Sequence, residues 1–140
     1  MTDRDVLAAT IWGEARGEST AGRLAVASVM RNRLLAQRWG TTYRAVCLAQ
    51  KQFSCWNVGD PNAPLLRRIF DSENRVEALR DPIVRECYWI ADGVLGDCLL
   101  PQVRDAQHYY ATWLAHPPTW AKTGRVVATI GQHVFLEGVA

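Results

Sequence analysis

Two glutamates and two glycines alternate within the stretch "GEARGE", residues 13–18. An apolar helical pattern leads up to this stretch. Gly13 and Gly17 make continuation of a helix costly. We therefore predict a helix from about residue 3 to about residue 16, with Gly17 as its C-terminal cap. Glu14 then lies in the last helical turn.

A carboxyl group in that position could do acid chemistry. The C-terminal end of a helix carries partial negative charge, which disfavours an ionised carboxylate, and an apolar cover such as Trp12 raises its pKa further. A carboxyl that stays protonated near neutral pH can protonate a leaving oxygen. The glycines would let a bulky substrate approach the backbone. The alternative is a solvated helix end with Arg16 and Arg23 as partners of Glu14, and spacing alone favours it.

Glu18 lies four residues after Glu14. On one continuous helix the two carboxylates would share a face, and repulsion would raise one pKa. If the helix ends at Gly17, Glu18 instead begins the next turn and helps to cap the second helix. The second arrangement is favoured, and it leaves Glu14 as the one strong acid candidate.

The elements that would position these groups form an α+β domain, mostly helical with a small β-region in the C-terminal third. After the first helix, four more are predicted: from Ser19 or Thr20 to Gly40, from Thr42 through Leu48, from Pro64 through Phe70, and from Pro82 to near Gly93–Gly96. After Leu100, three short segments rich in β-branched and aromatic residues predict strands: "AQHYYATWL", "RVVATIG" and "QHVFLEG". At 140 residues, with no repeat or linker, we expect one domain over residues 1–140.

Three stretches occur in a fixed order: "GEARGES" (13–19), "QFSCW" (52–56) and "HYYA…PPTWA…IGQHVF" (108–135). Together they resemble the SleB-type cell-wall hydrolases, a family of spore-cortex-lytic enzymes and bacteriophage endolysins, from about Leu7 to Phe135. The resemblance implies a lysozyme-like catalytic domain that acts on the glycan strands of peptidoglycan, with Glu14 as catalytic acid. It also implies lytic transglycosylation, in which the MurNAc–GlcNAc bond is cleaved to leave a 1,6-anhydro-MurNAc end. Gln132 departs from the Asn that relatives often carry.

The number of carboxylates favours the same chemistry. A retaining glycosidase needs a second carboxylate ~5 Å from the acid, and an inverting one needs it ~6.5–9.5 Å away. Asp60, Asp97 and Asp105 lie in turns, but nothing singles one of them out. A transglycosylase can manage with Glu14 alone, which first protonates the leaving oxygen and then accepts the proton of the MurNAc 6-hydroxyl. A hydrolytic muramidase is the alternative.

Substrate contacts are expected from residues that offer sugar rings an aromatic face, or offer their edges an amide, hydroxyl or charge. The candidates are Arg16, Glu18, Gln52, Phe53, Ser54, Trp56, His108, Tyr109 and Tyr110. Neighbouring strand residues face opposite sides, so at most one of the two tyrosines lines the cleft. For Phe53 and Trp56 a place in the core is favoured over the site, and for Trp12, Trp39 and Trp89 the core is expected. Arg16 could pair with Glu18 or meet the lactyl-peptide carboxylate of MurNAc.

Other classes of function find less support. A metal amidase needs three ligands, and His108, His116 and His133 form no HExxH motif or close pair, so we expect no metal and no cofactor. A Cys–His peptidase could use Cys55, but a packed thiol beside Trp56 is favoured. A peptidoglycan-binding module without activity would not need an intact Glu14.

Charge and hydropathy limit the partners and the location. A net charge of +2 gives no reason to expect nucleic-acid binding, and no apolar run approaches the ~20 residues of a membrane-spanning helix. The N-terminal stretch does not have the pattern of a secretory signal. We therefore expect synthesis in the cytosol and action on the cell wall after release. A monomeric phage endolysin that depends on a holin for release fits this description, and a spore-cortex-lytic enzyme is the alternative. The cysteines form no CxxC pair, and Cys47 and Cys87 are expected as small buried residues.

Overall fold

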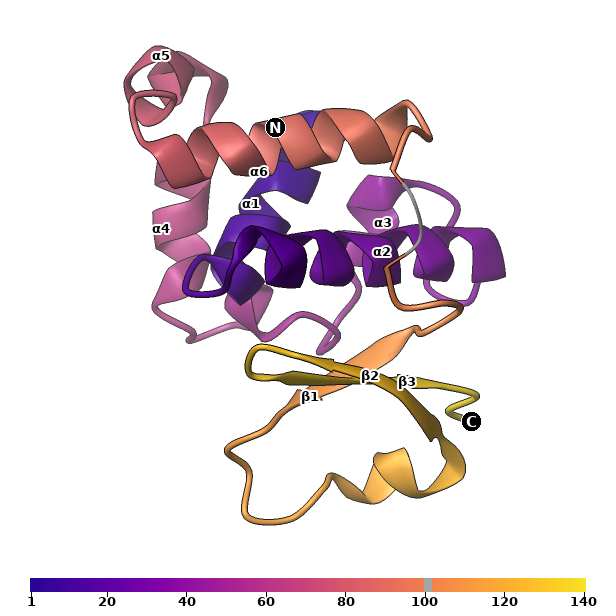
Figure 1. Ribbon diagram of the computed structural model, residues 1–140. Coiled ribbons are helices and arrows are strands. Elements are labelled where there is room, and N and C mark those ends of the chain that lie inside the picture. Colours follow the sequence, from indigo (N-terminus) through magenta and orange to yellow (C-terminus); the bar gives the residue numbers. More distant parts are fainter. Residues whose placement is uncertain (100–101) are drawn as a thin grey trace.

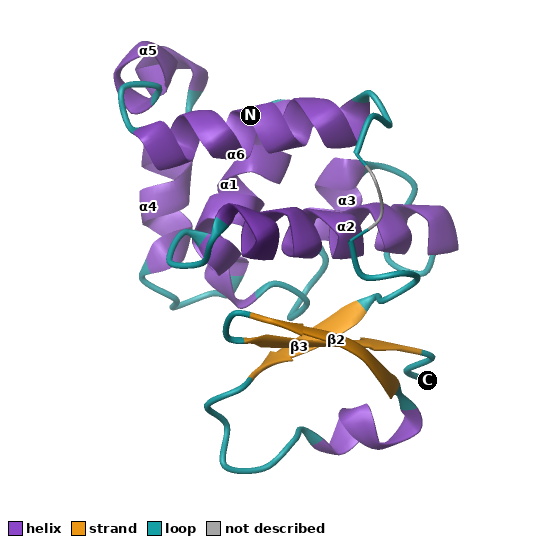
Figure 2. Cartoon of the chain, in the orientation of Figure 1, coloured by secondary structure: helices purple, strands orange, loops and turns teal. Residues whose placement is uncertain are grey.

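Helix α1 (Asp3–Ala15) runs through the middle of the protein, with other helices around it (Figure 1). The structure, a computed structural model, describes residues 1–99 and 102–140. The other helices are α2 (Thr20–Ala36), α3 (Tyr43–Leu48), α4 (Asn62–Ile69), α5 (Arg75–Ala78) and α6 (Pro82–Leu95), with short 3₁₀ helices η1 (Ser54–Trp56), η2 (Ser72–Asn74) and η3 (Thr119–Thr123). Three strands, β1 (His108–Ala111), β2 (Arg125–Ile130) and β3 (His133–Glu137), form a sheet on one side of the helices (Figure 2). The predicted α+β class, mostly helical with a C-terminal β-region, is confirmed.

The start of α1 is fixed by a capping box. The Thr2 hydroxyl accepts the backbone N–H of Asp5, and the Asp5 carboxylate accepts the backbone N–H of Thr2. Asp5 is fully buried, and its other oxygen accepts hydrogen bonds from Arg75 (2.7 Å) and Tyr88 (2.8 Å). Burial by itself would raise the pKa of Asp5, but these hydrogen bonds together lower it below its ordinary value.

The body of α1 is apolar on most of its sides because other helices cover it. It packs against α2, α3, α4 and α6, and six of its apolar side chains are exposed by 1% or less: Val6, Leu7, Ala8, Ala9, Ile11 and Ala15. Burial of a Leu or Ile side chain contributes about 1.5–3 kcal/mol. The helix that carries Glu14 near its end is therefore anchored firmly in the core.

The sheet has the order β1–β3–β2 and is antiparallel throughout. The register pairs Tyr109 with Phe135, which is fully buried in the core beneath the helices. Tyr110 points the other way and packs with Trp120, with ring centroids 6.2 Å apart, near a second small cluster of buried residues. The alternation predicted for the two tyrosines is thus confirmed, and Tyr109 faces the helices.

Several predicted boundaries are wrong for local reasons. Helix α2 ends at Ala36 rather than Gly40, because Gln37 takes a left-handed conformation (φ 57°) and its N–H bonds back to the last turn. Gly17 is not a left-handed cap, since Arg16 ends α1 with helical dihedral angles. Helix α4 begins two residues before Pro64, and the single-turn helix α5 was not predicted.

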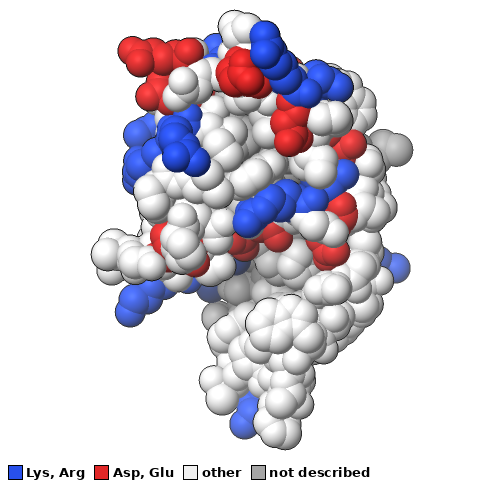
Figure 3. All heavy atoms as spheres, turned by 90° about the vertical axis from the view of Figure 1, so that its left-hand side faces the viewer, with Lys and Arg blue, Asp and Glu red and all other residues white. Residues whose placement is uncertain are grey.

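The exposed surface differs between the two layers. Figure 3 shows charged side chains gathered over the helical layer, whereas the part formed by the sheet and its connections is mostly uncharged on this face. Trp89 on α6 is 62% exposed, so its predicted place in the core is wrong. Trp12 and Trp39 are half-buried and pack against the core, and Cys47 and Cys87 are fully buried, as predicted. Over residues 1–99 and 102–140, none of the helices has the length and apolar character needed to cross a membrane.

Candidate active site

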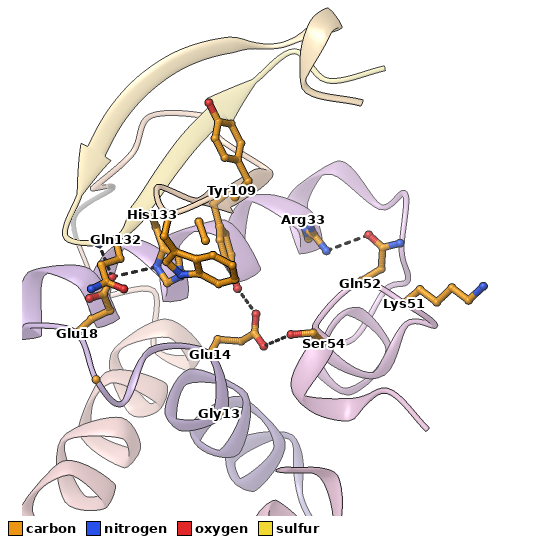
Figure 4. Close-up of a pocket in the computed structure, with 14 residues that line it drawn as sticks. Gly13, Glu14, Glu18, Arg33, Lys51, Gln52, Ser54, Tyr109, Gln132 and His133 are labelled. Atoms are coloured by element: carbon orange, nitrogen blue, oxygen red, sulfur yellow. Dashed lines mark hydrogen bonds and ion pairs between the residues drawn. The ribbon is translucent and has the colours of Figure 1, made fainter. Parts of the chain in front are cut away.

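Glu14 lies in the last turn of α1, and its carboxylate points into the space between the helices and the sheet (Figure 4). One oxygen, Oε1, accepts a hydrogen bond from the Tyr109 hydroxyl of β1. The other, Oε2, accepts the backbone N–H of Cys55 (3.2 Å) and the hydroxyl of Ser54 (3.4 Å) from η1. Two segments that are far apart in the chain, η1 and β1, thus hold both oxygens of the Glu14 carboxyl group in a fixed orientation.

Tyr109 is a permanent donor in this arrangement. Burial, together with the neighbouring Glu14 carboxylate, raises the pKa of Tyr109 well above its ordinary value. The phenol therefore stays protonated at any physiological pH and donates a hydrogen bond to Glu14. Its ring stacks at a tilt against His133 and Phe135, with centroids 4.7 Å and 5.6 Å away, so packing holds it in place.

Glu14 opens onto a cavity of about 660 Å³ between the end of α1 and the sheet. This volume lies within the range of ordinary small-molecule sites. Six of the residues expected at the site from the sequence border it: Glu14, Glu18, Gln52, Ser54, Tyr109 and Tyr110. Both tyrosines border it, whereas the alternation along the strand predicted at most one. Trp113, which is 73% exposed, adds an aromatic face at its rim.

Glu18 belongs to the same cavity, which corrects the expectation that it helps to cap α2. Ser19 caps that helix through the N–H of Gly22. The Glu18 carboxylate instead accepts the backbone N–H of Gln132 (2.8 Å) from the β2–β3 turn. A second carboxylate therefore lines the cavity, although the sequence singled out only Glu14 as an acid.

The turn that meets Glu18 requires glycine. Gly131 has φ +57°, and a Cβ atom there would lie 2.8 Å from Glu18 Oε1. His133 lies two residues after Gly131. Its Nδ1 is 3.4 Å from Glu18 Oε1, but the two atoms form no hydrogen bond. Burial lowers the pKa of His133, although the Glu18 and Glu14 charges oppose the shift. The imidazole is therefore neutral at pH 7.

The opposite wall of the cavity is cationic. Arg33 of α2 is 4% exposed, and its Nη1 donates a hydrogen bond to Gln52 Oε1 (3.3 Å). Lys51 lies beside Gln52 and is exposed (Figure 4). Sequence reasoning missed Arg33, Lys51 and His133 as residues of the site. Two of them could have been found from the sequence. Arg33 interrupts an otherwise apolar helical face, and His133 lies in the "IGQHVF" stretch.

Four expected substrate contacts lie outside this cavity. Phe53 is 1% exposed and belongs to the core, so it cannot stack on a sugar. The Trp56 indole donates to the buried Thr10 hydroxyl (2.9 Å), and its ring borders other surface hollows. Arg16 donates to Asn62 (2.9 Å) rather than to Glu18.

His108 is the fourth of these residues. It points to a neighbouring cavity, between the rings of Trp39 and Trp120, with centroids 5.6 Å and 5.3 Å away. The sequence therefore located the correct segment of β1, but it did not reveal which cavity the side chain faces.

Cys55 is positioned for packing rather than for nucleophilic attack. Its side chain is 2% exposed, and burial together with the Glu14 charge raises the pKa of its thiol. Its backbone N–H donates to Glu14 Oε2, and its buried thiol also interacts with that carboxylate. Elsewhere in the described ranges 1–99 and 102–140, no three His, Cys, Asp or Glu side chains converge in a way that could hold a metal ion.

The fold is similar to that of two solved catalytic domains. It is similar to the catalytic domain of the germination-specific lytic transglycosylase SleB from Bacillus anthracis, with a TM-score of 0.68, 22% identity, and coverage of 96% of this chain and 93% of that one. The catalytic domain of the Bacillus cereus SleB protein gives a TM-score of 0.60, 22% identity, and coverage of 96% and 89%.

The sequence profile described as Cell Wall Hydrolase matches residues 17–136, and the chain therefore belongs to the cell wall hydrolase family. The predicted family is thus confirmed. Glu18 lies within the matched span, while Glu14 lies three residues before it. A search among curated proteins found no match.

Proposed function

We propose that the cavity around Glu14 is the active site of a peptidoglycan lytic transglycosylase, which cleaves the glycan strand at the MurNAc–GlcNAc bond. The observation that carries this proposal is the Glu14 carboxyl group, held by three hydrogen-bond donors and open to a cavity of about 660 Å³. Membership of the cell wall hydrolase family supports the substrate. The likeness in fold to the lytic transglycosylase SleB supports the reaction.

The reaction uses one carboxyl group twice. Glu14 first gives its proton to the glycosidic oxygen, and the bond between that oxygen and C1 of MurNAc breaks, leaving positive charge shared by C1 and the ring oxygen. The Glu14 carboxylate then takes the proton of the 6-hydroxyl of the same sugar while O6 bonds to C1. The products are a GlcNAc with a free 4-hydroxyl and a 1,6-anhydro-MurNAc, and Glu14 is protonated again.

The neighbours of Glu14 keep the carboxyl group in the place that both steps require. Tyr109 cannot ionise, so it remains a donor to Oε1 throughout. The N–H of Cys55 and the hydroxyl of Ser54 fix the other oxygen. Fixed orientation matters because a displacement of about 1 Å can reduce a rate ~10²-fold.

Hydrolysis is the second candidate, and the position of Glu18 is the observation that favours it. Two carboxylates border one cavity, as in glycosidases that activate water. The Oε1 atom of Glu18 is already engaged by the N–H of Gln132, and a Cβ at Gly131 would touch both of its oxygens. This engagement gives Glu18 a role in attaching the β2–β3 turn to the helices, and it favours the single-carboxyl reaction.

The test is the mass of the products. Purified peptidoglycan is digested with the parent protein, Glu14→Gln and Glu18→Gln, and the released muropeptides are weighed. We expect products one water lighter than those of a muramidase, lost with Glu14→Gln and reduced with Glu18→Gln. Products of full mass that vanish with either variant would establish hydrolysis. A Glu14→Gln variant that cleaves as well as the parent would overturn both candidates, provided that thermal unfolding shows each variant to be folded.

The endolysin role, release through a holin, synthesis in the cytosol and the monomeric state remain predictions from the sequence. Lysis of host cells on co-expression with a holin, but not without one, is the measurement that checks the first two.

A further inference from the structure

A second cavity, of about 370 Å³, adjoins the one around Glu14. Four residues line both cavities: Arg33, Lys51, Gln52 and Tyr109. Figure 4 shows Arg33, Gln52 and Lys51 on the side of the Glu14 cavity that lies away from Glu18. The two hollows are therefore neighbours that share these side chains as a common wall.

The second cavity is strongly cationic. Arg33, Arg38 and Lys51 line it, and among the residues that the structure describes no Asp or Glu does. Val139 and Ala140 complete this side of the lining, and Arg38 donates to the carbonyl of Val139 (3.2 Å). His108 adds no charge at neutral pH, because burial and the nearby Arg33 and Arg38 lower the pKa of His108 to about 4. The Nδ1 atom of His108 is buried and has no hydrogen-bond partner within the described part of the chain.

Arg33 carries a buried charge without a counter-ion. Its Nε donates to the carbonyl of Gln107 (2.7 Å) and its Nη1 to Gln52 (3.3 Å), but among residues 1–99 and 102–140 it forms no ion pair. The other buried arginine, Arg23, is paired with a carboxylate at 2.8 Å. Burial lowers the pKa of Arg33 to about 10, although the neighbouring Tyr109, Cys47 and Glu14 oppose the shift. A buried charge is ordinarily paired, so an anionic ligand is the missing partner.

We propose that this second cavity is a subsite for the stem peptide of peptidoglycan, and that it binds carboxylates of that peptide through Arg33, Arg38 and Lys51. The inference rests on the proposed function. The stem peptide leaves the glycan through the lactyl ether at C3 of MurNAc, the same sugar whose C1 bond is cleaved, so it runs off the strand within one ring of Glu14. The rings of Trp39 and Trp120 offer an apolar surface to its aliphatic parts.

The kinetic test compares glycan strands that carry stem peptides with strands from which an amidase has removed them. We expect the parent to cleave the peptide-bearing strands at least tenfold faster at low substrate concentration. Arg38, which is exposed and lines only the second cavity, is the residue to change. Arg38→Glu is expected to reduce the ratio of the two rates about fivefold or more, because an exposed ion pair is replaced by repulsion. Lys122→Glu, the same charge reversal on an exposed residue of η3, leaves both rates at the parent level.

A binding measurement separates this inference from the proposed function. An N-lactyl stem peptide with free carboxylates is titrated into the parent protein by calorimetry, beside the same peptide with its carboxylates amidated. We expect heat from the first only, and its loss with Arg38→Glu but not with Lys122→Glu. Equal cleavage of both kinds of strand, or equal binding of the two peptides, would overturn the subsite while leaving the glycan activity intact. Peptide binding without cleavage of either strand would overturn the proposed activity instead.

Discussion

Substitution of Gly13, the residue before Glu14, tests how the site is held. A Cβ atom at this position would lie 2.8 Å from Cys55 Cβ, 2.9 Å from Cys55 Sγ and 3.1 Å from Leu66 Cδ1. Overpacking of this kind costs about 1–3 kcal/mol, and the better helix propensity of Ala offsets up to about 1 kcal/mol of it. We therefore expect Gly13→Ala to lower the free energy of unfolding by about 1 kcal/mol, which shifts Tm by about 4 °C.

The effect on activity is expected to exceed the effect on stability. The displaced residue, Cys55, is the one whose backbone N–H donates to Glu14, and that hydrogen bond is already 3.2 Å long. A shift of a few tenths of an ångström takes it beyond the range of a normal hydrogen bond and releases one oxygen of the carboxyl group. We expect kcat to fall about tenfold, by comparison with the ~10²-fold effect of a 1 Å displacement.

The assay is release of soluble muropeptides under saturating peptidoglycan, with thermal unfolding measured in parallel. Gly17→Ala is the control for stability, because a Cβ there meets nothing within 4 Å, and it should change Tm little. The double variant Gly13→Ala/Cys55→Gly removes the colliding atoms and should recover part of kcat. Full activity in Gly13→Ala, or a double variant no better than the single one, would refute this account of the glycine.

Three further predictions concern single side chains. Tyr109→Phe removes only the hydroxyl that donates to Glu14, and we expect kcat to fall about 10–100-fold, the equivalent of a hydrogen bond to a charged group. Cys55→Ala is expected to keep glycan cleavage within about threefold of the parent, because the thiol is buried and its raised pKa disfavours the nucleophilic thiolate. The pKa of Asp5 is lowered on folding, so its contribution to stability is present above pH 3.8 and is lost as the pH falls through the folded pKa. Asp5→Asn should flatten this acid limb in urea unfolding and destabilise the protein at pH 7 by about 2 kcal/mol.

Each of these has a result that would contradict it. A Tyr109→Phe variant with the parent's kcat would mean that the donor does not orient the acid. Loss of nearly all activity in Cys55→Ala, with an unchanged Tm, would instead support a Cys–His peptidase. An Asp5→Asn variant with the parent's acid limb would assign that limb to other carboxylates.

The parts of the fold that were predicted correctly are encoded locally. Thr2 and Asp5 fix the start of α1, and apolar spacing carries the helix to Glu14, so the position of the acid follows from about fifteen adjacent residues. The alternation of side chains along a strand was sufficient to predict that Tyr109 and Tyr110 point to opposite faces of β1. Neither inference required knowledge of what packs against these elements.

The parts that were missed depend on contacts between distant segments. The Glu18 carboxylate meets the N–H of Gln132, 114 residues further along the chain, and no local pattern predicts that contact. Phe53 and Ser54 are neighbours in an irregular stretch, yet one is buried in the core and the other borders the cavity. Gly13 was interpreted as room for substrate and does border the cavity, but its missing side chain also makes room for Cys55, which the sequence did not reveal.

The strand order β1–β3–β2 has a consequence for the time at which the enzyme becomes active during its synthesis. The central strand, β3, is made after both of its neighbours, so β1 and β2 have no partner until residues 133–137 have left the ribosome. Before then the nascent chain holds a helix with an acid at its end, but Tyr109 has no sheet to hold it against that acid. Translation itself thus delays assembly of the cleft until β3 has been made.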